Sequence, residues 1–211
     1  QEADELIQLA RANNRLIQVG FLERFNAAIL DLDVNRIKPL FIESHRLSPF
    51  NPRATDVNVI LDLMIHDIDI ILNIVDSDVK SIAASGTPVL TNSTDIANVR
   101  IEFENGAVAN VTASRASRDT VRKIRIFQPD AYISVDYQDR KIAIYRLRGD
   151  GMPVPGLPNV TMEHKKFKQG DPLMTEIESF IKTVRDGGSP VVSGEDGKRA
   201  LEVAMQINKK L

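Results

Sequence analysis

The stretch VNVILDLMIHDIDIILNIV, residues 57–75, is the most apolar long segment of this 211-residue chain. Aspartates interrupt it too often for a membrane span, so it predicts a helix buried inside a globular domain. At about 100° per residue, its polar side chains gather within a sector of roughly 80°. They are Asn58, Asp62, His66, Asp69 and Asn73. A polar stripe on a buried helix indicates either an internal hydrogen-bond network or the wall of a cleft.

Asp62 and His66 stand four residues apart, which brings their side chains together on one helical face. A carboxylate beside an imidazole raises its basicity and fixes its tautomer, as a general base near neutral pH requires. The residues equally allow His66 to be a core histidine bonded to a backbone carbonyl. Asp67 lies about 140° from Asp62 and is expected to cap or pair with a neighbouring element. No HExxH pattern occurs, so a metal site is disfavoured.

The residues before this helix predict alternating helices and strands. We expect a helix over residues 2–13, a short buried strand over 16–22, a helix over 25–37 and a strand over 40–47. A helix followed by a buried strand is half of a β/α layered unit, whose parallel neighbours arrive through crossover connections. The chain therefore begins like the last helix and strand of a doubly wound domain whose earlier units are absent.

After the buried helix, the pattern changes to short β-type runs joined by tight turns, which indicates a large, mostly antiparallel sheet. The runs are residues 79–90, 97–103, 107–114, 123–127, 132–137 and 141–147. Asn105-Gly106 predicts a type I′ hairpin turn between two of them. We expect a loop over residues 149–158, a helix over 172–185 and a final helix ending at Leu211.

Polar residues at strand ends are the other candidates for a site. The segment Glu23-Arg24-Phe25-Asn26 follows the predicted first strand, where open α/β sheets place their ligands. Arg24 could bind a phosphate or carboxylate, and Asn26 could bind sugar hydroxyls. His45 and Arg46, near the end of the next strand and followed by Asn51 and Arg53, could form a polar wall ahead of the buried helix. For each of these residues alone, ordinary surface placement is the competing interpretation.

Composition narrows the classes of partner. A formal net charge of −2 and a pI near 6.0 give no global reason to expect a nucleic acid or membrane partner. The absence of cysteine excludes disulfides and thiolate chemistry and fits a reducing cytoplasm. A basic cluster is expected to be a solvated sheet face or a subunit contact, because no aromatic row accompanies it. It comprises Arg115, Arg118, Arg122, Lys123 and Arg125.

Two motifs together resemble the Gfo/Idh/MocA oxidoreductases. VGFLERFNAAI, residues 19–29, is similar to the last Rossmann strand of that family and its G-x-x-x-R-F/Y segment. LDLMIHDIDIIL, residues 61–72, is similar to the D-x-x-x-H motif of its active-site helix, in a form close to the nucleotide-sugar dehydrogenase subgroup. The order of the motifs, the β runs and the final helices extend the resemblance over essentially the whole chain. Residues 57–60 depart from it, since many members have a glycine-rich segment there.

The resemblance implies an α/β fold in two parts. Residues 1–22 would be the C-terminal remnant of a Rossmann domain that binds NAD or NADP, and residues 23–211 the substrate-binding and catalytic domain. Homo-oligomerisation, as a dimer or tetramer, would occur through the open sheet. Neither the family's dinucleotide glycine motif nor its E-K-P lysine motif is present in this sequence, so we expect the fragment alone to be inactive.

The resemblance also implies a reaction. His66 would accept the hydroxyl proton of a sugar or nucleotide-sugar substrate while hydride passes to the nicotinamide, and Asp62 would position the substrate or the imidazole. Arg24, Asn26, His45, Arg53 and Asp69 are the candidate substrate-binding residues. Two alternatives stay open: an NAD-dependent glycosidase of the same family, and a non-catalytic dimerisation module whose polar stripe is internal packing.

Overall fold

A computed structural model of the chain describes residues 1–52, 56–148, 159–168 and 170–211. Its base is one eight-stranded sheet in the order β2-β3-β4-β1-β5-β6-β7-β8. The strands are β1 (Phe41–Leu47), β2 (Val79–Thr87), β3 (Ile96–Phe103), β4 (Val108–Ser114), β5 (Val121–Gln128), β6 (Ala131–Asp136), β7 (Lys141–Leu147) and β8 (Val160–Lys166). Only the β1–β4 pair is parallel, so the prediction of a mostly antiparallel open sheet is confirmed.

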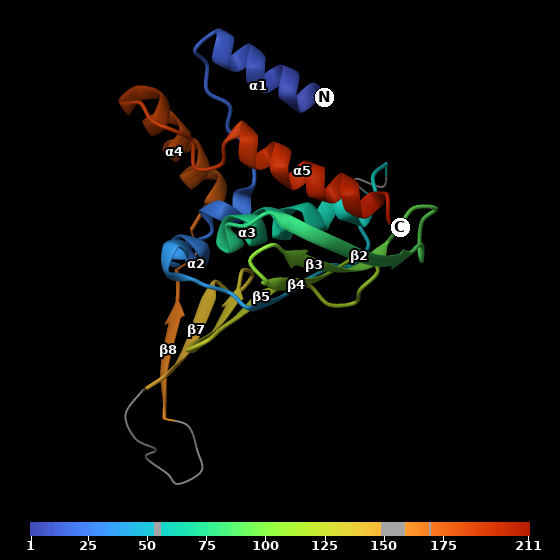
Figure 1. Cartoon of the computed structure of the whole chain (residues 1–211), viewed down its shortest axis with the longest axis vertical. Coiled ribbons are helices and arrows are strands. Elements are labelled where there is room, and N and C mark those ends of the chain that lie inside the picture. Colours follow the sequence, from blue (N-terminus) through green and yellow to red (C-terminus); the bar gives the residue numbers. More distant parts are fainter. Residues whose placement is uncertain (53–55, 149–158, 169) are drawn as a thin grey trace.

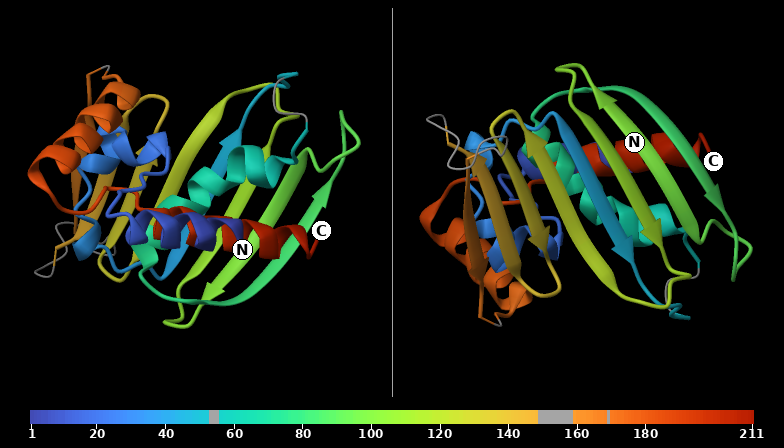
Figure 2. Two further views of the ribbon diagram at one scale, coloured as in Figure 1. Left: turned by 90° about the horizontal axis from the view of Figure 1, so that it is seen from above. Right: turned by 90° about the horizontal axis from the view of Figure 1, so that it is seen from below.

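The helices cover one face of this sheet in tiers. They are α1 (Glu2–Ala12), α2 (Ala27–Leu30), α3 (Ile65–Val75), α4 (Pro172–Asp186) and α5 (Gly194–Asn208), with the short 3-10 turns η1 (Leu22–Phe25) and η2 (Val34–Arg36) and the π-helical turn η3 (Ile60–Met64). Figure 1 shows α3 against the sheet, α5 above α3 and α1 above α5. Among the residues that the structure describes, no helix lies on the opposite face of the sheet, as the view from below in Figure 2 shows. Within the described residues, no helix combines the length and apolar character that crossing a membrane requires.

The core lies between α3 and the sheet. Ile60, Met64, Ile68 and Ile71 of the buried helix are fully shielded from solvent, as is Val111 on β4. Each fully buried aliphatic side chain of this kind stabilises the fold by about 1.5–3 kcal/mol. This packing anchors the polar residues of the same helix against the sheet.

Glycine allows the N-terminal segment to approach α5 closely. A Cβ atom added at Gly197 would lie 2.5 Å from Cγ2 of Val19, closer than atoms can pack. The segment does not form the strand predicted over residues 16–22. It makes one isolated bridge, between Gln18 and Ser193, because its described neighbour is the loop before α5 rather than a strand. The prediction of a strand was wrong.

The predicted helix over residues 25–37 is also wrong, since it is divided into η1, α2 and η2. Asn26 adopts an extended backbone with φ −67° and ψ 131°, and its side chain caps α2 by accepting from the backbone N–H of Ala28 at 3.1 Å. A local side-chain bond of this kind competes with a continuous helix. Strand β8 was not predicted. Nearly all its side chains are exposed, so it lacks the apolar alternation that would have revealed it.

The Asn105-Gly106 hairpin exists, but its turn is not type I′. A type I′ turn needs positive φ at both residues, and of these two only Gly106 has it, with φ 87°. The side chain of Asn105 instead donates to the carbonyl of Val75 at 3.3 Å and accepts from the N–H of Ala107 at 3.0 Å. The loop predicted over residues 149–158 lies outside the described residues.

Candidate active site

His66 lies in the first turn of α3, immediately after the π-helical turn η3. Its ring meets that of Phe21 edge-to-face, with 5.7 Å between centroids. Its Nδ1 is buried and has no hydrogen-bond partner in the described part of the chain. Burial lowers the pKa of His66, and the positive charge of Arg46 lowers it further, against the opposing charge of Asp67. The imidazole is therefore neutral at neutral pH, the form that can accept a proton.

A buried charge network lies beside His66 and holds α3 to β1. Asp67 is fully buried, accepts from Ser44 Oγ at 2.9 Å and pairs with Arg46 Nε at 2.5 Å. Arg46 Nη1 also donates to Glu23 Oε1 at 3.0 Å. Charge-assisted bonds of this kind are stronger than neutral ones. The expectation that Asp67 pairs with a neighbouring element is confirmed, and the network fixes the turn of helix that carries His66.

Arg24 and Asp69, two of the candidate substrate-binding residues, bind each other. Arg24 donates from Nε and Nη2 to the two carboxylate oxygens of Asp69, at 2.7 and 3.1 Å. Both side chains are buried, with 7% and 2% exposed. Burying either charge alone would be costly, so the pair satisfies itself inside the fold. The structure places both residues in an internal ion pair.

The two remaining substrate-binding candidates that the structure describes, Asn26 and His45, are already bonded or face away from the helices. Asn26 is buried and donates to the carbonyl of Tyr137 at 3.1 Å, besides capping α2. His45 sits between Ser44 and Arg46 on β1, and successive strand residues point to opposite faces. His45 therefore faces the side of the sheet without helices, which corrects its placement beside the buried helix. Arg53 lies outside the described residues.

Asp62 and His66 do not form the expected hydrogen bond. Asp62 lies inside η3, whose wider turn makes i→i+5 bonds and changes which residues stack. The charges that act on His66 come from Arg46, Asp67, Glu23 and Arg122 rather than from Asp62. Asp62 is half-buried, and burial raises its pKa while the charge of Arg115 lowers it.

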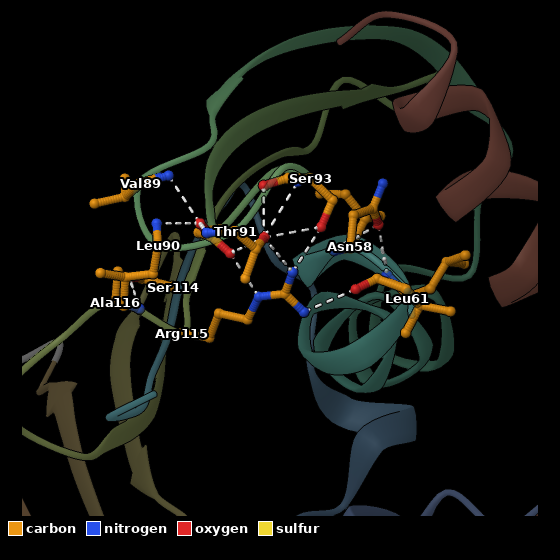
Figure 3. A network of polar contacts seen from close by, with 12 residues as sticks. Asn58, Leu61, Val89, Leu90, Thr91, Ser93, Ser114, Arg115 and Ala116 are labelled. Carbon is orange, nitrogen blue, oxygen red and sulfur yellow. Dashed lines mark hydrogen bonds and ion pairs between the residues drawn. The ribbon is translucent and has the colours of Figure 1, made fainter. Parts of the chain in front are cut away.

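Arg115 ties the start of this helix to the sheet (Figure 3). Its guanidinium donates to the carbonyl of Val57 at 2.7 Å, to Ser93 Oγ at 2.7 Å and to Asp95 at 2.8 Å. Asp95 is fully buried and also accepts three backbone N–H bonds, from residues 89–91. Burial raises the pKa of Asp95, but these donors and Arg115 together hold it below its usual value. The expected surface placement of Arg115 was wrong.

Comparison with known proteins gives the family. A profile of the GFO/IDH/MocA C-terminal domain matches residues 33–133. UDP-N-acetylglucosamine 3-dehydrogenase of Acidithiobacillus ferrooxidans is 36% identical over 208 residues, which are 98% of this chain and 66% of that protein. Its solved structure superposes with a TM-score of 0.91 and covers 100% of this chain and 67% of that one. The chain belongs to the GFO/IDH/MocA family.

A second GFO/IDH/MocA relative is more distant. The scyllo-inositol 2-dehydrogenase (NAD(+)) of Bacillus subtilis is 24% identical over 225 residues, which are 97% of this chain and 63% of that protein. The chain thus spans slightly less than two thirds of the length of both curated relatives. The names of the relatives divide their substrates into a nucleotide sugar and an uncharged polyol.

Two of the charged residues that act on His66, Asp67 and Arg122, were not singled out from the sequence as candidate site residues, whereas Glu23 and Arg46 belong to the polar segments at strand ends that were. Glu23, Arg46, Asp67 and Arg122 supply the charges that act on His66. Period-two alternation on β1 and β5 was the available signal, because it places Arg46 and Arg122 on the helix-facing side with the buried isoleucines. Which carboxylates meet these arginines is decided by segments distant in sequence, so the pattern alone does not show it.

Proposed function

We propose that this chain supplies the substrate-binding and catalytic residues of a nicotinamide-dependent oxidoreductase, which transfers hydride between a secondary hydroxyl of a sugar or nucleotide sugar and the nicotinamide. The observation that carries the proposal is the state of His66. Its ring is neutral at neutral pH, and its Nδ1 has no hydrogen-bond partner in the described part of the chain. The relatives named as dehydrogenases support the reaction class.

In this proposal His66 accepts the hydroxyl proton as the carbon loses hydride. The lowered pKa keeps the imidazole unprotonated before the reaction, and the charges of Asp67 and Glu23 favour the imidazolium once the proton arrives. These carboxylates are fixed by Arg46, so they are in place before the charge develops. The opposing charges of Arg46 and Arg122 prevent permanent protonation.

The nicotinamide, as NAD or NADP, supplies the hydride acceptor when bound. The chain's own residues fit such a ring, because Phe21 and Ile65 line an apolar pocket, and Phe21 meets the imidazole of His66 edge-to-face. Asp62 is half-buried in the same helix and is proposed to orient the substrate by accepting from a sugar hydroxyl. Arg115 supports that role by holding the start of the helix and by favouring the carboxylate form of Asp62.

The test is His66→Ala in the complete protein that contains this chain. Loss of a general base lowers turnover by about 10²- to 10⁴-fold, which is measured by the absorbance of reduced nicotinamide with UDP-N-acetylglucosamine and with free sugars. His164→Ala is the matched control, because His164 is exposed on β8 and contacts the ring of Tyr145. Turnover of His66→Ala close to that of the control would contradict the proposal.

The two alternative functions, a glycosidase and a dimerisation module, predict different outcomes in activity assays of the complete protein. A glycosidase of this family would release nitrophenol from nitrophenyl glycosides without net reduction of nicotinamide. A dimerisation module would show neither activity in the complete protein. The division at residue 22 and oligomerisation through the open sheet face stay predictions.

A further inference from the structure

Arg122 lies beside the buried charge network and contacts it through a single ion pair, with Glu23. It is paired in register with Arg46 across strands β5 and β1, and both side chains point to the helix-covered side of the sheet. Arg46 is 4% exposed, whereas Arg122 is 47% exposed. Both guanidinium groups approach the same oxygen, Glu23 Oε1, at 3.0 Å from Arg46 and 3.6 Å from Arg122.

Glu23, the carboxylate that both arginines approach, lies closer to Arg46 than to Arg122. Arg46 makes a hydrogen bond to Glu23 and two to Asp67, so its charge is neutralised inside the fold. The 3.6 Å contact of Arg122 is an ion pair beyond hydrogen-bond length. Among the described residues, the guanidinium of Arg122 makes no hydrogen bond, although a guanidinium carries five N–H donors. Its donors are therefore free to bind a ligand.

Arg122 is also close enough to His66 to act on it. The positive charge of Arg122 is one of the four that shift the pKa of His66, and Glu23, whose charge also acts on His66, pairs with Arg122 at 3.6 Å. A half-exposed planar fork of donors thus lies on the helix-covered face of the sheet, in register with Arg46, whose partner Asp67 follows His66 in the chain. Such a fork matches the two oxygens of a phosphate or a carboxylate, whereas an uncharged polyol offers it no charge-assisted bond.

We propose that Arg122 binds an anionic group of the sugar substrate, which makes the substrate a nucleotide-linked or acidic sugar rather than an uncharged polyol. The inference rests on the proposed function, since it assigns the substrate class of that same site. Lys123, next in the chain, points to the opposite face of the sheet and pairs with Asp136 at 3.1 Å. Of these two adjacent cations, the proposal assigns the specificity to Arg122.

The experiment compares Arg122→Gln with Arg125→Gln in the complete protein. Arg125 is a matched control, because it lies on the same strand, is 44% exposed, makes a single ion pair with Glu43 at 3.3 Å and faces the side without helices. Equilibrium binding of UDP-N-acetylglucosamine, glucuronate and myo-inositol is measured by calorimetry, which needs no turnover. Nicotinamide reduction with each compound is then followed.

We expect the wild type and Arg125→Gln to bind one of the two anionic compounds more tightly than myo-inositol, and the preferred compound distinguishes phosphate from carboxylate recognition. Arg122→Gln should lose about 10- to 100-fold in affinity for that compound, the usual range for a charge-assisted bond. Its affinity for myo-inositol should stay unchanged, and Arg122→Lys should recover part of the loss. An unchanged melting temperature would show that Arg122→Gln is folded.

Equal binding by Arg122→Gln and Arg125→Gln would overturn the inference, as would a wild type that prefers myo-inositol. These outcomes are separable from failure of the proposed function. Binding that depends on Arg122 without any nicotinamide reduction would refute the oxidoreductase and keep the anion site. Sugar oxidation that does not change when Arg122 is replaced would support the oxidoreductase and refute the anion site.

Discussion

Replacing Arg115 with methionine removes the cation of the network in Figure 3 while keeping a side chain of similar length. The variant leaves Asp95 buried without its ionic partner, which lies at 2.8 Å in the wild type, with the two side chains 3% and 0% exposed. Breaking a buried pair in this way costs about 3–5 kcal/mol. We expect about 3 kcal/mol, at the lower end, because Asp95 keeps its bonds to the backbone of residues 89–91.

The assays are urea unfolding, which gives the free energy of unfolding, and thermal unfolding, both monitored by circular dichroism. For a protein of this length, a loss of about 3 kcal/mol lowers the melting temperature by about 6–12 °C. Arg100→Met is the control, since Arg100 lies on neighbouring strand β3, is 46% exposed and pairs with Glu102 at 3.2 Å. Its free energy of unfolding should change by less than about 0.5 kcal/mol. If Arg115→Met were as stable as Arg100→Met, the network would not carry the stability assigned to it.

Arg115→Met also tests how the stability contributed by Asp95 depends on pH. Although burial raises the pKa of Asp95, its donors hold it below the usual value, so its contribution is complete above about pH 4 and is lost as the pH falls further. Removing Arg115 takes away one of these donors and raises the pKa of Asp95. The variant should therefore unfold at a higher pH than the wild type in an acid titration, and an unchanged acid midpoint would contradict this.

Three further predictions follow from single contacts. The acid limb of kcat/KM for hydroxyl oxidation should have an apparent pKa below about 6.5, because burial lowers the pKa of His66; a limb above pH 7 would exclude His66 as the base. Gly197→Ala should lower the free energy of unfolding in urea by about 1–3 kcal/mol, because the new methyl group would lie 2.5 Å from a Val19 carbon. Gly170→Ala is the neutral control, because a Cβ atom there would have nothing within 4 Å. Tyr137→Phe should raise the free energy of unfolding by about 1 kcal/mol, because the buried hydroxyl has no hydrogen-bond partner among the described residues; a loss of stability would show that the hydroxyl is bonded.

Local patterns in the sequence predicted the elements whose stability is local or whose apolar period is clear. The helices at residues 2–12, 172–186 and 194–208 follow amphipathic periodicity and caps, and the alternating β runs became strands β2 to β7. The motif around His66 pointed to the helix that carries the candidate base. The segments predicted wrongly were those whose backbone depends on one specific contact. Residues 16–22 lack a described strand to pair with, and the cap at Asn26 divides the helix predicted over residues 25–37.

The sequence alone determined that polar groups on a buried helix had to be satisfied, but not by which partners. Arg24 meets Asp69 across 45 positions, Arg46 meets Asp67 across 21, and Arg115 meets Asp95 across 20. Only tertiary packing brings such residues together, because hydrogen bonds and ion pairs act over a few ångströms in space regardless of sequence separation. It therefore also decided which polar side chains hold one another inside the fold and which, such as His66 Nδ1 and the guanidinium of Arg122, have no hydrogen-bond partner among the described residues.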